Sequence, residues 1–200
     1  MRRAPEKGRY DDATVERILD RGLVAHVAFV DRGEPVCVPF LHARVERRLY
    51  LHGSRASRAM RILAAGEPAC VSVTVVDGLV LARSVFEHSA NYASVVAFGR
   101  FEAVEAAEEK AAALEAFTEK LLPGRWREAR QPSAKELKAT TVVALPLDEA
   151  SAKVRSGPPE DAPEDVDLPV WSGVVPIHLA VDESEYDWRR VRDGRLGPPR

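Results

Sequence analysis

The sequence predicts an α+β protein built around an antiparallel β-barrel. Seven or eight short segments are rich in β-branched and aromatic residues and are separated by turn-forming residues, which is typical of antiparallel strands. Two or three helical segments interrupt them, so we expect helices over the ends or the seam of the barrel. A chain of 200 residues with 46% hydrophobic content is long enough for one well-packed domain. We therefore expect one domain over residues 1–182 and a polar tail over residues 183–200.

The first third of the chain alternates between helix and strand patterns. Apolar residues at helical spacing between Asp12 and the stop residue Gly22 predict a helix over 12–21. The turn-forming segments Asp31-Arg32-Gly33 and Val45-Glu46-Arg47 then divide an antiparallel meander. Its expected strands cover 23–30, 35–43 and 48–53. A short helix over 56–65 follows and ends at Gly66.

The remaining strands are predicted by composition and by turn signals. They cover 69–76, 79–83, 93–105, 140–147, 151–155 and 171–181. Asp77-Gly78 is a strong hairpin signal between the first two. The longest helix is expected over 106–122, and Ser133 with Glu136 forms a capping box for another short one. The proline-rich, acidic segment 156–169 is expected to be an exposed loop.

Charge and composition exclude several classes of function. Lys and Arg total 29 against 31 Asp and Glu, so there is no basic excess to neutralise a nucleic acid. Cys37 and Cys70 lie in apolar runs, which is typical of reduced thiols in a core. No apolar run approaches the ~20 residues of a membrane-spanning helix. These two features lead us to expect a cytoplasmic protein with no membrane partner. The histidines are scattered without zinc-ligand spacing, so we expect no metal site.

Three segments carry the candidate binding residues, and each has a plainer structural interpretation. His52 to Arg58 turns from a strand into a helix, where free backbone amides, Ser54, Ser57 and two arginines suit a phosphate, although Ser54 could simply cap the helix. The polar segment 83–94 contains His88, Asn91 and Tyr92 and is either a binding loop or a polar connection. Trp171 either faces a ligand or packs in a core or interface.

Taken in order, these segments resemble a known flavoprotein family. The runs VPFLHA, LYLHGSRASRAM, DGLVLARSVFEHSANYASVVAFG, SAKVRSGPPED and LPVWSGVVP are similar to the split-barrel flavoproteins related to pyridoxamine 5′-phosphate oxidase, in the branch that includes flavin-nucleotide-binding proteins and nitroimidazole reductases. The similarity spans roughly residues 12–181. It implies an FMN-binding split barrel and a homodimer with the flavin at the interface.

The resemblance also implies which residues hold the flavin. Val38, Pro39 and Phe40 would face the isoalloxazine ring, and His52, Gly53, Ser54, Ser57 and Arg58 would hold the phosphate. Asn91, Tyr92 and Ser94 would contribute polar contacts, and Trp171 would reach the flavin of the other subunit. Two departures matter: Ala93 stands where relatives often have Arg, and the substrate grip of the true oxidases is missing after the last strand.

The function expected from the sequence is therefore an FMN-dependent oxidoreductase for a small molecule, with NADH or NADPH as a potential electron donor. No residue is assigned as catalytic, and His88 and His52 are the weak candidates for moving a proton because they lie nearest the inferred flavin. The alternatives are a flavin-binding module or sensor without turnover, and a heme-binding or heme-degrading relative. The absence of the substrate-binding residues expected after the last strand argues against a true pyridoxamine phosphate oxidase.

Overall fold

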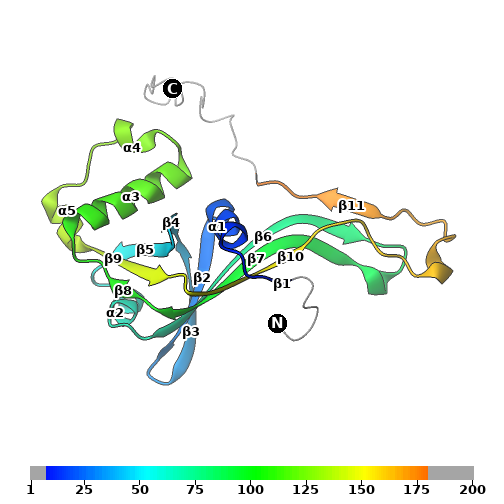
Figure 1. The fold of residues 1–200 in the computed structure, drawn as a ribbon, viewed down its shortest axis with the longest axis horizontal. Helices are drawn as coiled ribbons and strands as arrows, with labels where there is room; N and C mark the ends of the chain where they lie inside the picture. Colours follow the sequence, from blue (N-terminus) through cyan, green and yellow to red (C-terminus); the bar gives the residue numbers. More distant parts are fainter. Residues whose placement is uncertain (1–7, 180–200) are drawn as a thin grey trace.

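The computed structural model describes residues 8–179, which form two antiparallel sheets with helices around them (Figure 1). The larger sheet has the order β1-β10-β7-β6-β2-β3, with β11 added to β6, and the smaller sheet has the order β4-β5-β9-β8. The strands are β1 (Gly8–Arg9), β2 (Val24–Asp31), β3 (Glu34–Leu41), β4 (Ala43–Val45), β5 (Arg48–Ser54), β6 (Pro68–Leu81), β7 (Ser89–Arg100), β8 (Glu102–Ala103), β9 (Thr140–Pro146), β10 (Glu149–Arg155) and β11 (Gly173–Pro176). The helices are α1 (Asp12–Arg21), α2 (Arg58–Ala64), α3 (Ala107–Leu121), α4 (Arg125–Glu128) and α5 (Ala134–Ala139). The predicted α+β split-barrel class is confirmed.

The main core lies between the two sheets and is covered on one side by α1. Successive side chains of a strand point to opposite faces, so Ala25, Val27 and Phe29 of β2 turn inward and the residues between them turn outward. Leu51, Val73 and Val95 from neighbouring strands pack into the same core. Each fully buried Val, Leu or Phe side chain contributes about 1.5–3 kcal/mol relative to exposure.

Helix α1 forms where the sequence predicts it. Asp11 caps the start of α1 by accepting a hydrogen bond from the Thr14 amide at 2.9 Å. Ile18 and Leu19 on the inner face of the helix are buried in the main core. A Cβ atom on Gly22 would lie only 2.2 Å from Cγ1 of Val73. Glycine is therefore needed for the chain to leave the helix so close to β6.

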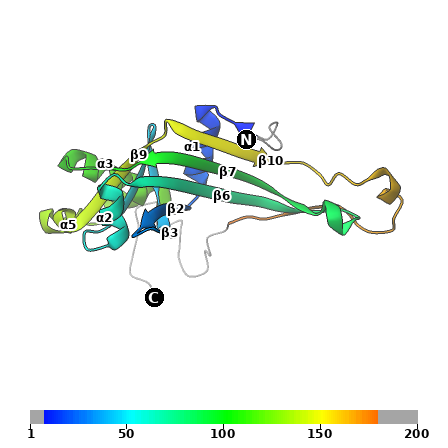
Figure 2. The ribbon, with the colours of Figure 1, turned by 90° about the horizontal axis from the view of Figure 1, so that it is seen from below.

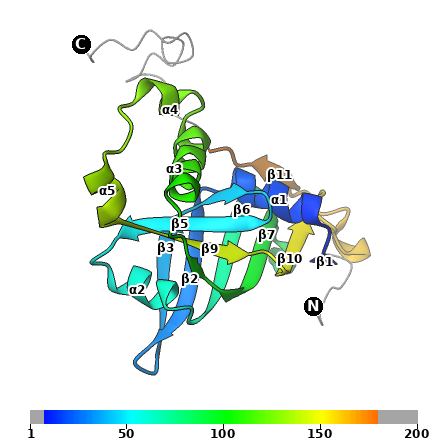
Figure 3. The ribbon, with the colours of Figure 1, turned by 60° about the vertical axis from the view of Figure 1, so that its left-hand side comes forward.

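The smaller sheet carries a second core, which α3 covers from outside (Figure 3). Phe117 and Ala113 of α3 pack on Tyr50 and Val142, and the Tyr50 hydroxyl donates to Glu109 at 2.9 Å. The capping box at the start of α5 is confirmed, and α4 is a short helix that the sequence pattern did not predict. No helix in the described part of the chain is long and apolar enough to cross a membrane.

The largest departure from the predicted elements is at Asp77-Gly78. We predicted a hairpin there, but β6 runs through both residues as one strand, and the extra residue is accommodated by a β-bulge between Val76 and Gly78. Asp77 uses this position to connect distant parts of the fold: its carboxylate pairs with Arg21 of α1, and its carbonyl accepts from the Ile177 amide at 3.0 Å.

Because β6 is not interrupted, β6 and β7 extend beyond the barrel as a long arm (Figures 1 and 2). We define the arm as residues 78–91 together with 156–177. The predicted loop 156–169 runs along it, and β11 then pairs with the end of β6. The last strand is shorter than predicted, since only Gly173–Pro176 is paired, and the predicted residues 180 and 181 lie outside the described residues.

Candidate functional site

The outer face of the larger sheet carries apolar, hydroxyl and thiol side chains together with His26. Strand register aligns its residues in rows across β3, β2, β6 and β7. The rows are Cys37, Ala28, Cys70 and Phe98, then Pro39, His26, Ser72 and Val96. The next residues along these strands on the same face include Leu41, Val24, Thr74 and Ser94. Several of the apolar members are exposed, so this face could support a planar ligand.

The predicted ring-binding residues lie on β3, which is an edge strand of this sheet. Val38 and Phe40 are half-buried and pack against the main core, whereas Pro39 between them is exposed on the outer face. An edge strand leaves backbone groups on one side without a neighbouring strand. The side chains of Val38 and Phe40 therefore anchor β3 to the main core. The unpaired backbone groups on its open edge could form hydrogen bonds with a ligand.

The predicted phosphate-binding turn, residues 52–58, joins β5 directly to α2. Ser57 caps α2, because its hydroxyl oxygen accepts from the Met60 amide, and the Ser54 hydroxyl oxygen accepts from the Ala56 amide at 3.2 Å. Gly53 is needed because a Cβ atom there would lie 2.8 Å from Cγ of Met60. Both serines keep their O–H donors for a ligand while their oxygens stabilise the turn.

Arg58 connects this turn to the end of β2. Its Nε lies 3.0 Å from Oδ2 of Asp31, and its side chain remains 61% exposed. Asp31 fixes the guanidinium through Nε, and no other ion-pair partner of Arg58 is found among residues 8–179. The terminal nitrogens of Arg58 are therefore available for an anion at the turn.

His52 points away from this turn. Strand alternation puts Leu51 and Gly53 toward the barrel and Tyr50 and His52 toward α3. The His52 ring makes an edge contact with Phe117 at a centroid distance of 4.3 Å, and its buried Nδ1 has no hydrogen-bond partner in the described chain. Burial lowers the pKa of His52, which keeps the imidazole neutral. The structure thus brings only the backbone of His52 to the turn.

The polar segment 88–94 is mostly strand, because β7 begins at Ser89. Tyr92 and Ser94 lie on the outer face, where the Lys153 ammonium is 5.6 Å from the centre of the Tyr92 ring. Ala93 is buried in the main core. The position at which relatives often have Arg therefore makes no polar contact on the outer face here.

Asn91 has a structural role in this chain. It is 9% exposed, its Nδ2 donates to the Gly157 carbonyl at 3.0 Å, and its Oδ1 accepts from Arg155 at 2.9 Å. Both ends of its amide group therefore form hydrogen bonds within the chain, and they connect β7 to the segment that follows β10.

His88 stands at the end of a 3₁₀ turn, η2 (Val85–Glu87), on the arm. Its Nδ1 lies 3.1 Å from the Val85 carbonyl. A carbonyl can only accept, so Nδ1 must carry the proton, and Nε2 is left with its lone pair exposed. The neighbouring Val85 and Phe86 are 83% and 89% exposed, which is unusual for side chains of this size.

Trp171 also lies on the arm and is 63% exposed, so it is not a core residue. Its ring lies over Gly173, where a Cβ atom would approach the ring to 2.6 Å. Arg83 holds the preceding loop: its backbone amide donates to Asp161 at 2.7 Å, and its guanidinium donates to Ser172 at 2.7 Å. The Arg83 amide, followed by the guanidinium, lowers the pKa of Asp161, so this carboxylate stays charged.

The candidate residues therefore fall into two groups. The barrel group is Pro39 with the turn residues Ser54, Ser57 and Arg58, and the arm group is His88 and Trp171. Pro39 is level with Ser72 of β6, whereas His88 lies beside the far end of β6, about nine residues further. At 3.3 Å per residue these positions are roughly 30 Å apart. One chain does not bring His88 and Trp171 next to its own β3.

The sequence analysis missed two sets of residues. His26 lies on the outer face between Pro39 and Ser72, which the alternation of β2 could have revealed. The second set is the basic lining of one hollow of about 420 Å³, where Arg61, Lys110 and Lys138 lie with Arg55, which the predicted phosphate-binding turn already contained. They come from four separate segments, so no local pattern could have grouped them.

Comparisons with known proteins show the family and the fold of the chain. A family model described as pyridoxamine 5′-phosphate oxidase matches residues 11–154. The structure is similar to the flavocytochrome Anf3 of Azotobacter vinelandii, with 41% identity over 90% of this chain and 84% of that chain and a TM-score of 0.83. It is also similar to an FAD- and heme-binding protein of Mycobacterium smegmatis, with 40% identity over 90% and 92% of the two chains and a TM-score of 0.81.

A more distant similarity concerns the fold alone. A protein of Bacteroides thetaiotaomicron described as a 5-nitroimidazole antibiotic resistance protein is 22% identical over 74% of this chain and 86% of that chain, with a TM-score of 0.63. No curated protein matches the chain.

Proposed function

Because the chain belongs to the pyridoxamine 5′-phosphate oxidase family, a flavin-binding family, we propose that it is a flavin-dependent oxidoreductase that works as a homodimer. The observation that supports this most is the position of Arg58, Ser54 and Ser57 at a turn beside the open edge of β3. A flavin bound there would supply redox chemistry by accepting and passing on electrons. The protein would supply binding and orientation.

The residues of the 52–58 turn and of the outer face fit a flavin. Arg58 and the two serine hydroxyls offer donors to a phosphate, and exposed Pro39 with neighbouring His26 and Ser72 offers a surface for the ring. Tyr92 and Ser94 add hydroxyl groups on the same face. The sequence led us to propose FMN, and the 40% identity to an FAD- and heme-binding protein makes FAD the competing flavin.

The homodimer proposal rests on the separation of the barrel group and the arm group. His88, Phe86 and Trp171 are exposed on an arm that leaves its own barrel (Figure 2). A second copy would bring the arm of one chain to the β3 side of the other, which would cover these side chains and shield a bound flavin from water.

The first test is the absorbance spectrum of freshly purified protein, followed by release of the pigment and its identification by chromatography. We expect yellow absorbance and one flavin, FMN or FAD. Arg58→Ala should weaken flavin binding about tenfold or more, since it removes a charge-assisted contact. Arg17→Ala, an exposed arginine of α1, is the matched control. A colourless protein that binds neither flavin would contradict the proposal.

Turnover is tested separately by anaerobic mixing with NADH or NADPH. Reduction of the flavin within seconds would support an oxidoreductase. A flavin that stays oxidised with both donors would leave a flavin-binding module without turnover as the function.

The second candidate is a flavocytochrome that binds heme as well as flavin, which the identity of about 40% to two heme-containing proteins favours. His88 is the imidazole best arranged to hold heme iron, because its Nδ1 bond to Val85 fixes the ring and leaves Nε2 free. The exposed Val85 and Phe86 would cover a porphyrin. His42 is unsuitable because it is 1% exposed.

Heme binding has its own spectroscopic test. We expect a Soret band in protein produced with added heme, and we expect His88→Ala to lose it while retaining flavin absorbance. His26→Ala, which changes another exposed histidine, should keep the band. Equal Soret absorbance in wild type and His88→Ala would show that another residue binds the iron.

A further inference from the structure

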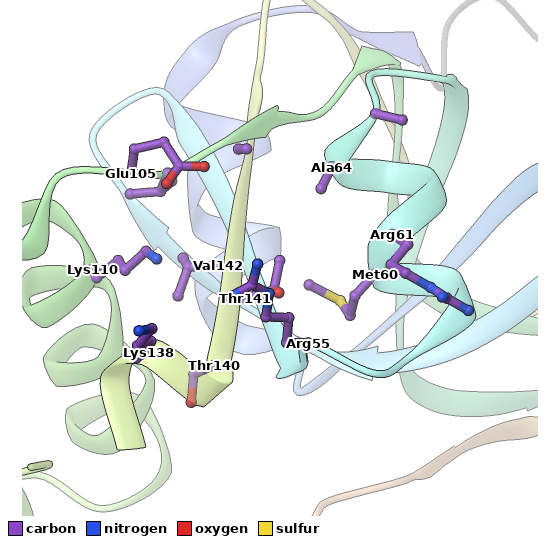
Figure 4. Close-up of a pocket in the computed structure, with 13 residues that line it drawn as sticks. Arg55, Met60, Arg61, Ala64, Glu105, Lys110, Lys138, Thr140, Thr141 and Val142 are labelled. Carbon is purple, nitrogen blue, oxygen red and sulfur yellow. The ribbon is translucent and has the colours of Figure 1, made fainter. Parts of the chain in front are cut away.

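A hollow between α2, α3, α5 and the start of β9 is lined by four cations (Figure 4). Arg55 comes from the β5–α2 turn, Arg61 from α2, Lys110 from the first turn of α3 and Lys138 from α5. Across the described residues 8–179, none of these four has an ion-pair partner. Glu105 is the only carboxylate among the residues that line the hollow. The hollow is therefore strongly positive.

This concentration of charge is local. The chain as a whole carries a net charge of −2, so carboxylates are not scarce. Most other arginines near the smaller sheet are neutralised: Arg44 pairs with Asp20, and Arg48 pairs with Glu102 and Glu109. Arg55, Lys110 and Lys138 lie around the hollow, whereas the Arg61 side chain extends away from it on α2 (Figure 4). Like charges around one hollow repel one another, and a bound anion would relieve that repulsion.

The floor of the hollow is formed by buried apolar residues and two threonines, so the surface that it exposes to a ligand is mainly polar. Met60, Val104 and Val142 are buried, and they line the hollow together with half-buried Thr140 and Thr141. The hollow measures about 420 Å³, which is within the size range of small-molecule sites. A cationic rim above two threonine side chains fits the phosphate groups of a ligand.

We propose that this hollow binds the phosphate-bearing part of a nucleotide. The proposal deepens the proposed flavin function and rests on it for the choice of nucleotide, because Arg55 belongs to the same turn as Ser54, Ser57 and Arg58. Two sources share this chemistry: the ADP half of FAD, and the phosphates of a pyridine dinucleotide that donates electrons. The first source would explain a preference for FAD over FMN.

The test uses a double variant and a matched control in the full-length protein. Lys110→Gln with Lys138→Gln removes two charges from the rim and keeps side chains of similar length. Lys135→Gln changes an exposed lysine of the same helix, α5, that does not line the hollow. Circular dichroism and thermal unfolding should be the same for all three proteins, because the changed side chains are not in the core.

Each protein is titrated with FAD, FMN, NADPH and pyrophosphate. We expect pyrophosphate to bind wild type and control, and to bind the double variant about tenfold more weakly, because two partly exposed charge contacts are lost. A tenfold loss for FAD with no loss for FMN would identify the ADP half of FAD as the occupant. A tenfold loss for NADPH with both flavins unchanged would identify the pyridine dinucleotide.

The proposal fails if FAD, NADPH and pyrophosphate each bind wild type and double variant within a factor of two. It also fails if pyrophosphate does not bind wild-type protein freed of nucleotide. A protein that binds no flavin would refute the proposed flavin function alone, since the pyrophosphate titration would still decide whether the cations form an anion site.

Discussion

The side chains of His42 and Lys120 meet at the end of α1, where Nζ of Lys120 lies 3.1 Å from Nε2 of His42. Lys120 also donates to the Leu19 carbonyl at 2.8 Å, so this contact joins α3 to the last turn of α1. His42 is buried between the end of β3 and the start of β4. Burial and then the nearby Lys120 charge lower the pKa of His42 to about 4, although Asp20 acts in the opposite direction.

This contact predicts a loss of stability in mild acid. Unfolded His42 takes up a proton near pH 6.5, but folded His42 does so only near pH 4, so the unfolded state binds more protons between these values. The free energy of unfolding should therefore be fully retained above pH 6.5 and fall by up to about 3 kcal/mol as the pH drops toward 4.

Urea denaturation at several pH values between 4.5 and 7.5 measures this slope. His42→Leu should flatten it, because the group that takes up the proton is gone. Lys120 adds little to the slope below about pH 7: burial lowers its pKa to about 8, so it is largely protonated in both states there. An unchanged slope in His42→Leu would show that other groups cause the acid sensitivity.

The Arg83–Asp161 contact predicts that one carboxylate holds the loop along the arm. Asp161→Asn should loosen segment 156–172, because it removes the charge that Arg83 binds through its amide and its guanidinium. Cleavage by a glutamate-specific protease at Glu160 and Glu164 should become faster. Asp167→Asn, which changes an exposed carboxylate of the same loop, should leave the rate near that of wild type.

The Gly53–Met60 contact predicts a steric cost in the flavin-binding turn. Gly53→Ala would place a methyl group against buried Met60 and should lower the free energy of unfolding by about 1–3 kcal/mol. Adding Met60→Ala to Gly53→Ala should cost less than Met60→Ala costs alone, since the clash is then removed. Additive losses in this double-mutant cycle would rule out the clash.

The exposed arm predicts a change of oligomeric state. Phe86→Arg should convert a dimer to a monomer in light scattering, because it puts a charge where the proposed interface covers an apolar side chain. Leu121→Arg changes an exposed apolar residue of α3, away from the arm, and should remain dimeric. A wild-type protein that is monomeric at all concentrations would refute the homodimer proposal.

The parts of the fold that the sequence predicted are those set by local patterns. Helix α1 and the hairpin at Arg32-Gly33 depend on caps, turns and alternation within a few residues. Asp77-Gly78 misled the prediction because a bulge and a hairpin share these residue types, and pairing with β7 and β11 decides between them.

The candidate site was predictable to a similar extent. The turn at Ser54 and Ser57 follows from a local pattern. Pro39 was assigned to the same site only by the family resemblance. What the resemblance could not supply was direction: His52 faces α3, and Asn91 is bonded inside the chain. Side-chain direction depends on strand register across the sheet, which a single sequence does not reveal.

The bulge at Asp77 also fixes which chain lengths the arm can tolerate. On the barrel side of it, Val71 and Val73 point inward, and on the arm side Val80 and Ala82 do, so the inward positions change from odd to even numbers. Deleting Asp77 would remove the bulge and make Val76 and Gly78 consecutive partners of Tyr92 and Asn91, so Val80 and Ala82 would still point inward. In evolution, a single deletion in this stretch of β6 should therefore persist at the bulge itself, whereas one on either side of the bulge would reverse the inward side chains; the exposed loop 156–169 can change length by single residues.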